Sequence, residues 1–349
     1  MGFLTILFIV LLVYLSYYFL RDYQIDPVTK IKSSLFLLKC ELSGMDNSSY
    51  LKEKPPPTKK QTKAIKMKGF FCQHYTAVYE NKNCSCRVLG KELDGKEKRS
   101  LMIYIHGGGF CMGSSGDKRD LTFLSELVEQ FPSLIIASVD YSLSPKHEFP
   151  VQIGDCVRCI KWLLISEEFP LVGLQDQIDF QKIVLCGSGA GGNLAIACLP
   201  LLKQQKICDS ILGLILVAPW LFVRPLVKSR FEPRNQYFIT EPIIRWCETK
   251  YLNSDPSLLW SPQVCPLKSE NFLHFPQTLL LTSGRDPLQD EHLMFKKKLK
   301  QNNVKIRHTH FEKRVFCFHL NGTKKHRQEA INTIIPFLYS IIYVNKKNK

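Results

Sequence analysis

Two glycine-rich segments of this sequence have residue types and spacing that suit acyl-transfer chemistry. The first reads HGGGF at residues 106–110, including Gly107, Gly108 and Gly109, and directly follows the apolar run 101–105. Attack on a carbonyl carbon produces a negatively charged oxygen. Backbone N–H groups can stabilise that oxygen, and consecutive glycines let the backbone approach it without Cβ clashes. This run after a strand predicts an oxyanion hole of the lipase and esterase type rather than an ordinary glycine-rich turn.

The second segment is similar to the turn that carries a serine nucleophile, but the serine is displaced. Residues 187–192 read GSGAGG and follow the apolar run 183–186. A nucleophile elbow reads Gly-x-Ser-x-Gly, and in the frame that starts at Gly187 its central position is Gly189. The elbow demands a backbone angle that glycine adopts without strain. We therefore expect the turn to form without its hydroxyl group.

Ser188 is the alternative nucleophile, one position early in the turn. Its side chain should leave the turn in a different direction from that of residue 189, away from a base placed to serve that position. An attacking oxygen must lie about 3 Å from the carbonyl carbon, and small displacements are costly. The sequence favours a lost or weakened nucleophile and leaves open an active site that uses Ser188.

The rest of the chain alternates apolar runs with segments of helical pattern and length, which is typical of a mostly parallel sheet flanked by helices. The fold class is therefore α/β. Residues 221–275 interrupt the alternation, and we expect them to form a cap over the end of the sheet. We expect strands at 101–105, 134–139, 183–186, 212–217, 278–282 and 304–311, and helices at 121–131, 153–165, 190–203, 290–302 and 328–344.

Length and charge fit one large domain preceded by a basic linker. The chain has 349 residues, 45% of them hydrophobic, and a formal net charge of +16. Much of that charge lies in the lysine- and proline-rich stretch 51–68, without zinc-finger spacing or an RNA-binding motif. We therefore expect no nucleic-acid partner and interpret the stretch as a solvated linker near a membrane. The predicted parts are an anchor at 1–22, a linker with cap elements at 23–69, and the α/β domain at 70–349.

An uncharged apolar run at residues 3–20 predicts an N-terminal transmembrane helix. At about 1.5 Å per residue it just spans a hydrocarbon core of roughly 30 Å. No basic residues precede it and no small-residue cleavage pattern follows, which favours an anchor over a cleaved signal peptide. The orientation stays open. Basic residues after the run favour a cytoplasmic domain, whereas the glycosylation sequons at Asn47, Asn83 and Asn321 matter only in the lumen.

The cysteines do not indicate a metal site. There are 13 of them, an odd number, so they cannot all pair within the chain. Cys84 and Cys86, and likewise Cys156 and Cys159, have no second Cys or His pair at ligand spacing. We expect neither a metal nor another cofactor, and the disulfide pairing stays unassigned.

The two motifs and their surroundings resemble the arylacetamide deacetylase-like proteins, in the hormone-sensitive-lipase group of α/β hydrolases. The similarity covers most of the chain. It includes the apolar N-terminus, HGGGFCMGSS at 106–115, VDYSLSPKHEFP at 139–150, GSGAGGNLA at 187–195 and GRDPLQDE at 284–291. The resemblance implies an α/β-hydrolase fold that hydrolyses small apolar esters and amides, anchored in the endoplasmic reticulum membrane and facing the lumen. Members read GDSAGG where this chain reads GSGAGG.

The same resemblance implies roles for single residues. Gly108, Gly109 and Ala190 would supply the oxyanion N–H groups, next to Gly107. Asp286 would be the triad acid that orients the base and stabilises its imidazolium form. Asp286 follows a predicted strand, and the order Ser, Asp, His along the chain is the one expected of this fold.

The position of the catalytic base follows less directly from the resemblance. Members place it in a Glu-x-Gly-Phe-His-like run, and here Glu312 begins the corresponding segment. Without a gap, Phe316 falls at the base position. With an insertion of three residues His319 falls there, preceded by Phe318 as in the family, and we prefer His319.

These observations predict a membrane-anchored protein of the carboxylesterase family with weak or absent activity. Two alternatives remain open. One is an active serine esterase that uses Ser188, His319 and Asp286. The other is a non-catalytic protein that binds a small apolar ester or amide ligand, or a partner, through the old pocket. The sequence does not indicate an oligomeric state.

Overall fold

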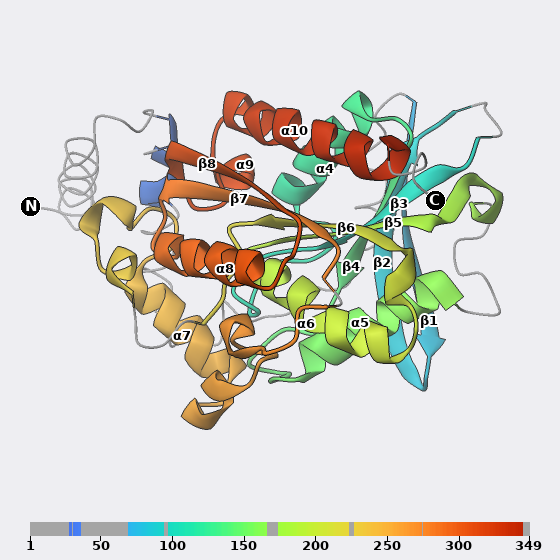
Figure 1. Cartoon of the computed structure of the whole chain (residues 1–349). Coiled ribbons are helices and arrows are strands. Elements are labelled where there is room, and N and C mark those ends of the chain that lie inside the picture. Colours follow the sequence, from blue (N-terminus) through green and yellow to red (C-terminus); the bar gives the residue numbers. More distant parts are fainter. Residues whose placement is uncertain are drawn as a thin grey trace, which may run out of the picture.

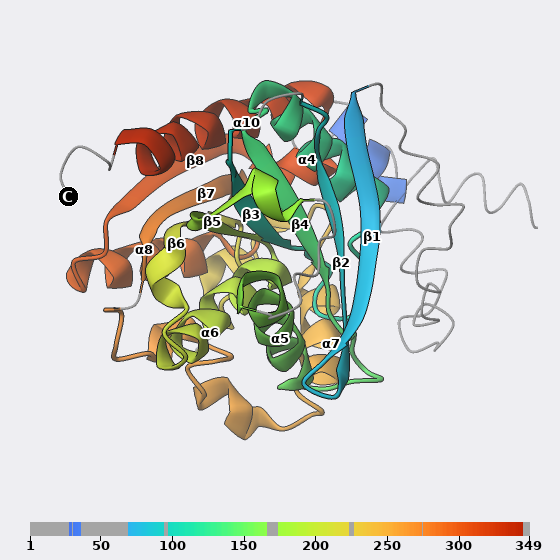
Figure 2. The same cartoon turned by 90° about the vertical axis from the view of Figure 1, so that its right-hand side faces the viewer.

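The computed structural model describes residues 28–29, 31–35, 69–93, 97–165, 174–222, 227–273 and 275–344. In this part of the chain, helices cover both faces of one twisted sheet (Figures 1 and 2). The apolar run 3–20 and the basic stretch 51–68 lie outside the described residues. Among the helices that are described, none combines the length and apolar character needed to cross a bilayer.

The sheet has 8 strands in the order β1-β2-β4-β3-β5-β6-β7-β8. Strands β3 to β8 pair in parallel, whereas β1 and β2 form an antiparallel hairpin that joins the sheet through β4. The strands are β1 Phe70–Tyr79, β2 Lys82–Lys91, β3 Arg99–Ile105, β4 Leu134–Asp140, β5 Ile178–Ser188, β6 Ile211–Val217, β7 Gln277–Arg285 and β8 Ile306–Val315.

The central strands are continuous apolar runs because helices cover both of their faces. Every residue of β3 is buried, and β4 is buried at all positions except its last. The structure confirms the expected parallel strands. It adds the β1–β2 hairpin, which the sequence analysis did not predict. β1 lies at the sheet edge, and its residues are half-buried or exposed. Its sequence therefore lacks the apolar run that identifies the central strands.

The helices form two layers. Figures 1 and 2 show α4 and α10 on one face of the sheet, and α5, α6 and α8 on the other. The short α9 precedes α10, and α7 belongs to the cap. The helices are α4 Lys118–Gln130, α5 Val151–Ile165, α6 Ala190–Gln204, α7 Glu241–Tyr251, α8 Gln289–Gln301, α9 Phe318–Asn321 and α10 Lys324–Tyr339.

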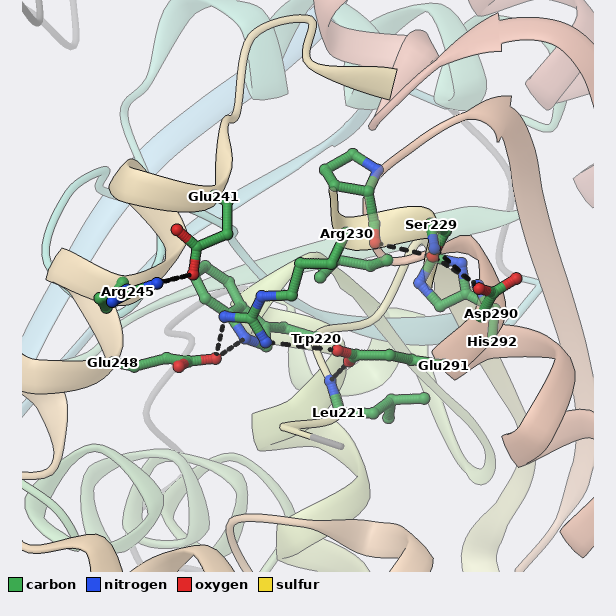
Figure 3. Close-up of polar contacts among 12 residues, drawn as sticks. Trp220, Leu221, Ser229, Arg230, Glu241, Arg245, Glu248, Asp290, Glu291 and His292 are labelled. Atoms are coloured by element: carbon green, nitrogen blue, oxygen red, sulfur yellow. Dashed lines mark hydrogen bonds and ion pairs between the residues drawn. The ribbon is translucent and has the colours of Figure 1, made fainter. Parts of the chain in front are cut away.

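The predicted cap lies between β6 and β7 and contains α7 and several short 3₁₀ helices. A buried ionic network attaches it to the main domain (Figure 3). Arg230 is fully buried; its Nη2 donates to Glu248 Oε1 on α7 at 2.6 Å, and its Nη1 lies 3.7 Å from Glu291 Oε1 on α8. Trp220 Nε1 also donates to Glu248 Oε1, at 3.4 Å, and the N–H of Leu221 donates to Glu291 Oε2 at 3.1 Å. These contacts hold the cap in place beside the site.

Candidate active site

A cavity of about 120 Å³ lies at the carboxyl ends of β3 and β5, under the cap. The two glycine-rich motifs form its polar end, and apolar side chains from the cap and the β8–α9 turn form much of its wall. A larger surface groove of about 510 Å³ lies between α6 and the segment 261–275, but it contains none of the motif residues. The apolar wall includes Met112, Trp220, Phe238, Ile239, Ile243, Phe316 and Leu320.

The residues expected to form the oxyanion hole line one end of this cavity together. Gly108 and Gly109 have φ angles of +112° and +61°. A Cβ on Gly108 would lie 2.0 Å from Met112 O, and one on Gly109 would lie 2.6 Å from Cys247 Sγ, so both positions require glycine. Ala190 begins α6, and its N–H has no intrahelical partner, as at the start of any helix. The loop and the helix start can thus present N–H donors to one ligand oxygen.

Gly189 forms the strained turn between β5 and α6. Its φ of +53° and ψ of −119° match the expectation of a positive angle. Its N–H donates to Val217 O at 3.0 Å, and its carbonyl oxygen accepts from the N–H of Trp220 at 2.9 Å. A Cβ placed on Gly189 would lie 3.2 Å from Phe316 Cζ and 3.9 Å from Cys317 Sγ. A side chain at this position would therefore point at the β8–α9 turn.

Ser188, the alternative nucleophile, is fully buried at the end of β5. Its Oγ lies 2.9 Å from the hydroxyl of Tyr104, which in turn donates to Asp120 Oδ1. Burial raises the pKa of Tyr104 well above its usual range. The phenol therefore stays protonated and cannot take a proton from Ser188 as a general base. The structure gives Ser188 a structural hydrogen bond and no base.

Asp286 follows β7 and is fully buried. Its Oδ1 accepts from the N–H of Leu288 at 2.8 Å, and its Oδ2 accepts from Ser283 Oγ at 3.3 Å. Burial raises the pKa of this carboxyl to about 8, because desolvation outweighs both hydrogen bonds. Among the described residues, the histidine atom that the structure places against this carboxyl is His292 Nδ1, 3.9 Å from Oδ2.

His292 does not serve as a base at this site. It lies on α8, is fully buried, and is absent from the cavity lining. Its Nε2 makes a 2.9 Å hydrogen bond with Pro219 O. Burial lowers its pKa to about 3, so its ring stays neutral at physiological pH.

The preference for His319 as the base does not fit the geometry. His319 lies on α9, fully buried, with its ring edge-on to Phe123 at a centroid distance of 4.8 Å. Neither ring nitrogen has a hydrogen-bond partner among the described residues, and the side chain does not line the cavity. Burial lowers its pKa to about 3. The structure therefore brings His319 to neither Asp286 nor Ser188.

Cys317 is the cavity residue beside Gly189, and the sequence analysis missed it: its Sγ would lie 3.9 Å from a Cβ on Gly189. It lines the cavity, is buried, and begins α9 with φ and ψ both at 46°. Burial raises the pKa of its thiol well above the usual range, and the charge of Asp286 adds to this rise. An insertion of one residue, instead of three, would have matched Phe316-Cys317 with the Phe-His of the family. A thiol with a raised pKa is no substitute for an imidazole base.

The other expected sites have different surroundings. Asn83 is exposed on β2, and Asn47 lies outside the described residues. Asn321 is 8% exposed; its Nδ2 donates to Phe316 O at 3.0 Å and its Oδ1 accepts from Arg119 Nη1 at 3.1 Å. A glycan on Asn321 is therefore incompatible with this packing. Within the described residues, no group of His, Cys, Asp and Glu side chains could hold a metal ion.

Comparisons with known proteins give the same fold and family as this geometry. The chain belongs to the α/β-hydrolase fold family, which matches residues 102–320. It is 25% identical to the human protein arylacetamide deacetylase-like 2 in an alignment 270 positions long, which covers 62% of this chain and 66% of that protein. It is 27% identical to an arylesterase of Saccharolobus solfataricus over 209 residues, 60% of this chain and 65% of the relative. The similarity to arylacetamide deacetylase-like proteins is thereby confirmed, although the chain spans just under two thirds of the length of these relatives.

Solved structures support the fold. An arylesterase structure superimposes with a TM-score of 0.71 at 24% identity, over 91% of this chain and 99% of that one. The hyperthermophilic esterase from Pyrobaculum calidifontis gives a TM-score of 0.68 at 22% identity, over 89% and 93% of the two chains. At these identities the similarity establishes the fold alone.

Proposed function

We propose that this protein is a carboxylesterase-family member that binds small apolar esters or amides in the cavity and hydrolyses them very slowly or not at all. The observation that carries this proposal is Gly189 at the centre of the elbow. Of the described residues that line the cavity, none is a histidine. Acyl transfer to serine requires a hydroxyl and a base at hydrogen-bond distance from each other. The one serine among these lining residues, Ser188, bonds to the phenol of Tyr104 and not to a base.

The binding half of the site remains. The N–H groups of Gly108, Gly109 and Ala190 suit a carbonyl oxygen, and the aromatic and aliphatic wall suits an apolar acyl or aryl group. Enzymes that lose their triad keep roughly 10³–10⁴-fold acceleration over water through the oxyanion hole and substrate binding. A trace of hydrolysis therefore agrees with the proposal, whereas turnover typical of an esterase does not.

We also propose that residues 3–20 anchor the protein in the endoplasmic reticulum membrane, with the α/β domain in the lumen. The uncharged apolar run and the resemblance to membrane-anchored deacetylases support this placement. The exposed sequon at Asn83 is the site that a luminal domain would offer for glycosylation. A mobility shift with an endoglycosidase that Asn83→Gln abolishes is the expected result. Glycosylation of no residue would argue against the luminal placement.

The decisive experiment compares hydrolysis of p-nitrophenyl acetate and butyrate by four proteins. These are the wild type, Ser188→Ala, Gly189→Ser and the double variant Gly189→Ser/Cys317→His. We expect the first two to be equally inactive. Gly189→Ser should gain little, because Cys317 cannot act as its base and the Phe316 ring must shift by a few tenths of an ångström. The double variant should gain at least about tenfold over Gly189→Ser, since a positioned general base contributes typically 10²–10⁴-fold.

One outcome would establish the second candidate function instead. If the wild type is active and Ser188→Ala abolishes the activity, the protein is a serine esterase with a displaced nucleophile. Binding is measured separately with the amide N-(4-nitrophenyl)butanamide, which should raise the midpoint of thermal unfolding of the wild type. Ile243→Trp fills the cavity and should remove this shift. An equal shift in both proteins would show that the amide binds elsewhere.

A further inference from the structure

The helical residues 28–29 and 31–35 have the reverse of the usual amphipathic pattern. Val28, Ile31 and Leu35 are 51%, 42% and 52% exposed, and their spacing places them on one side of a helix. Thr29 and Ser34 are buried, at 1% each. A helix of a water-soluble surface buries its apolar stripe and exposes its polar residues. The reversed pattern therefore indicates that an apolar phase covers the exposed stripe of Val28, Ile31 and Leu35.

This helical segment contacts the rim of the cavity through the buried Ser33 and through the ammonium group of the exposed Lys32. Ser33 Oγ accepts a hydrogen bond from the N–H of Phe238 at 3.0 Å, and Lys32 Nζ donates to Gly322 O at 2.8 Å. Phe238 lines the cavity, and Gly322 follows Asn321, which also lines it. In Figures 1 and 2 the segment is the dark blue piece beside α9 and the cap. The apolar stripe therefore lies on a segment that contacts the cavity rim directly.

The chain that precedes the segment limits what can cover the stripe. Residues 21–27 connect it to the apolar run 3–20. Even when fully extended, at about 3.6 Å per residue, this connection spans roughly 25 Å. If residues 3–20 are embedded in a bilayer, the stripe cannot be far from the bilayer surface. Aliphatic side chains at that surface lower their free energy by entering the boundary between headgroups and acyl chains.

We propose that the stripe of Val28, Ile31 and Leu35 docks the rim of the cavity onto the lipid bilayer. The proposal rests on the membrane anchoring proposed above and is independent of whether the site hydrolyses its ligand. Its consequence for ligand choice is direct. The cavity takes apolar esters and amides that are dissolved in the bilayer, and these enter without crossing bulk water.

Lipid contact can be measured with the full chain reconstituted in phosphatidylcholine vesicles. Ile31→Trp adds a tryptophan to the stripe. The fluorescence of the added tryptophan is obtained by subtracting the wild-type spectrum from that of the variant. Val78→Trp is the matched control, because Val78 is 72% exposed and belongs to the β1–β2 hairpin, which Figure 1 draws at the far end of the molecule. Lipids brominated near the headgroup should quench the added tryptophan of Ile31→Trp at least threefold more than that of Val78→Trp.

Equal quenching of the two added tryptophans would overturn the proposal. In that case a triple variant with Val28, Ile31 and Leu35 changed to serine identifies what packs against the stripe instead of lipid. A lower unfolding midpoint of the triple variant in detergent would indicate another segment of this chain, and loss of concentration-dependent cross-linking would indicate a second copy. Failure of the wild type to float with vesicles would overturn anchoring and docking together. None of these measurements depends on ligand binding, so the proposed binding of esters or amides in the cavity would stand.

Discussion

At the scale of single residues, the site differs from a serine esterase at two neighbouring positions. Gly189 has no hydroxyl at the nucleophile position, and the residue beside it at the start of α9 is Cys317 instead of a histidine. The acid remains but has no base to orient, and its burial without a cationic partner favours its protonated form. These two differences, with the turn and the oxyanion loop intact, are the basis for our proposal that the protein binds its ligand and hydrolyses it very slowly or not at all.

Gly189→Ala tests the strained turn. Alanine at φ +53° is strained, and its Cβ would press on Phe316 Cζ at 3.2 Å. We expect the variant to lose about 1–3 kcal/mol in free energy of unfolding, measured by chemical denaturation. Gly154→Ala in α5 is the control, because its φ is ordinary and its Cβ meets only Arg158 at 3.9 Å. Unchanged stability of Gly189→Ala would contradict the positive backbone angle.

Asp286→Asn tests the protonated acid. The unfolded carboxyl loses its proton near pH 4, whereas the folded one keeps it to about pH 8. Between these values the native state binds more protons, so its stability falls as pH rises, by up to about 1.4 kcal/mol per unit. Asparagine has no proton to lose, so the advantage of the variant over the wild type should grow from pH 5 to pH 8. A constant difference across this range would show that the carboxyl is ionised in the fold.

His319→Leu distinguishes a packed histidine from a base. Burial of the ring without hydrogen-bond partners costs stability, so the leucine variant should gain about 1 kcal/mol at pH 7. The folded pKa is about 3, below the usual value, and wild-type stability therefore falls as pH drops through 6.5 towards 3. The gain should be larger at pH 5 than at pH 7 in thermal unfolding. If the wild type hydrolyses esters and this variant does not, His319 has a catalytic role after all.

At the scale of elements, the shape of the cavity depends on how the cap is held. The η4 turn Lys228–Arg230 and α7 contribute one side of the buried network, and α8 contributes the other. Arg230 lies between two buried carboxylates, so its charge is compensated only as long as cap and main domain stay together (Figure 3). A buried ion pair is weak evidence for net stability, but its disruption is costly because it leaves an uncompensated charge.

Arg230→Met should therefore destabilise the protein by about 3–5 kcal/mol, since it removes the buried guanidinium that lies between the buried carboxylates of Glu248 and Glu291. The triple variant with both glutamates changed to glutamine should recover most of this loss in chemical unfolding. Arg245→Met is the control, because the side chain of Arg245 is 68% exposed and its pairing with Glu241 is worth at most about 1 kcal/mol. Equal losses for Arg230→Met and Arg245→Met would show that the network does not hold the cap.

At the scale of the whole molecule, the cap and the helical residues 28–29 and 31–35 lie at one end of the sheet (Figure 1). Both contact or line the cavity at that end. A polar end formed by the oxyanion loop and an apolar wall suit a ligand with one carbonyl group and an apolar body. Under the docking proposed above, the exposed apolar stripe brings the same end of the molecule to the bilayer. The apolar wall and the proposed docking both favour a ligand that partitions into membranes. The proposed function and the proposed docking surface therefore imply the same kind of ligand.

The sequence by itself determined the parallel sheet, the oxyanion loop and the glycine at the elbow. Each depends on local information: apolar runs of strand length, and glycines at fixed offsets after a strand. Only the tertiary structure decided the base position, because the turn after β8 brings Phe316 and Cys317 to Gly189 and directs His319 into the core beside Phe123. It also determined the surroundings of Ser188, whose hydroxyl bonds to that of Tyr104 on the neighbouring strand. Contacts between segments so distant along the chain follow from the packing of the whole fold, which no local pattern of residues specifies.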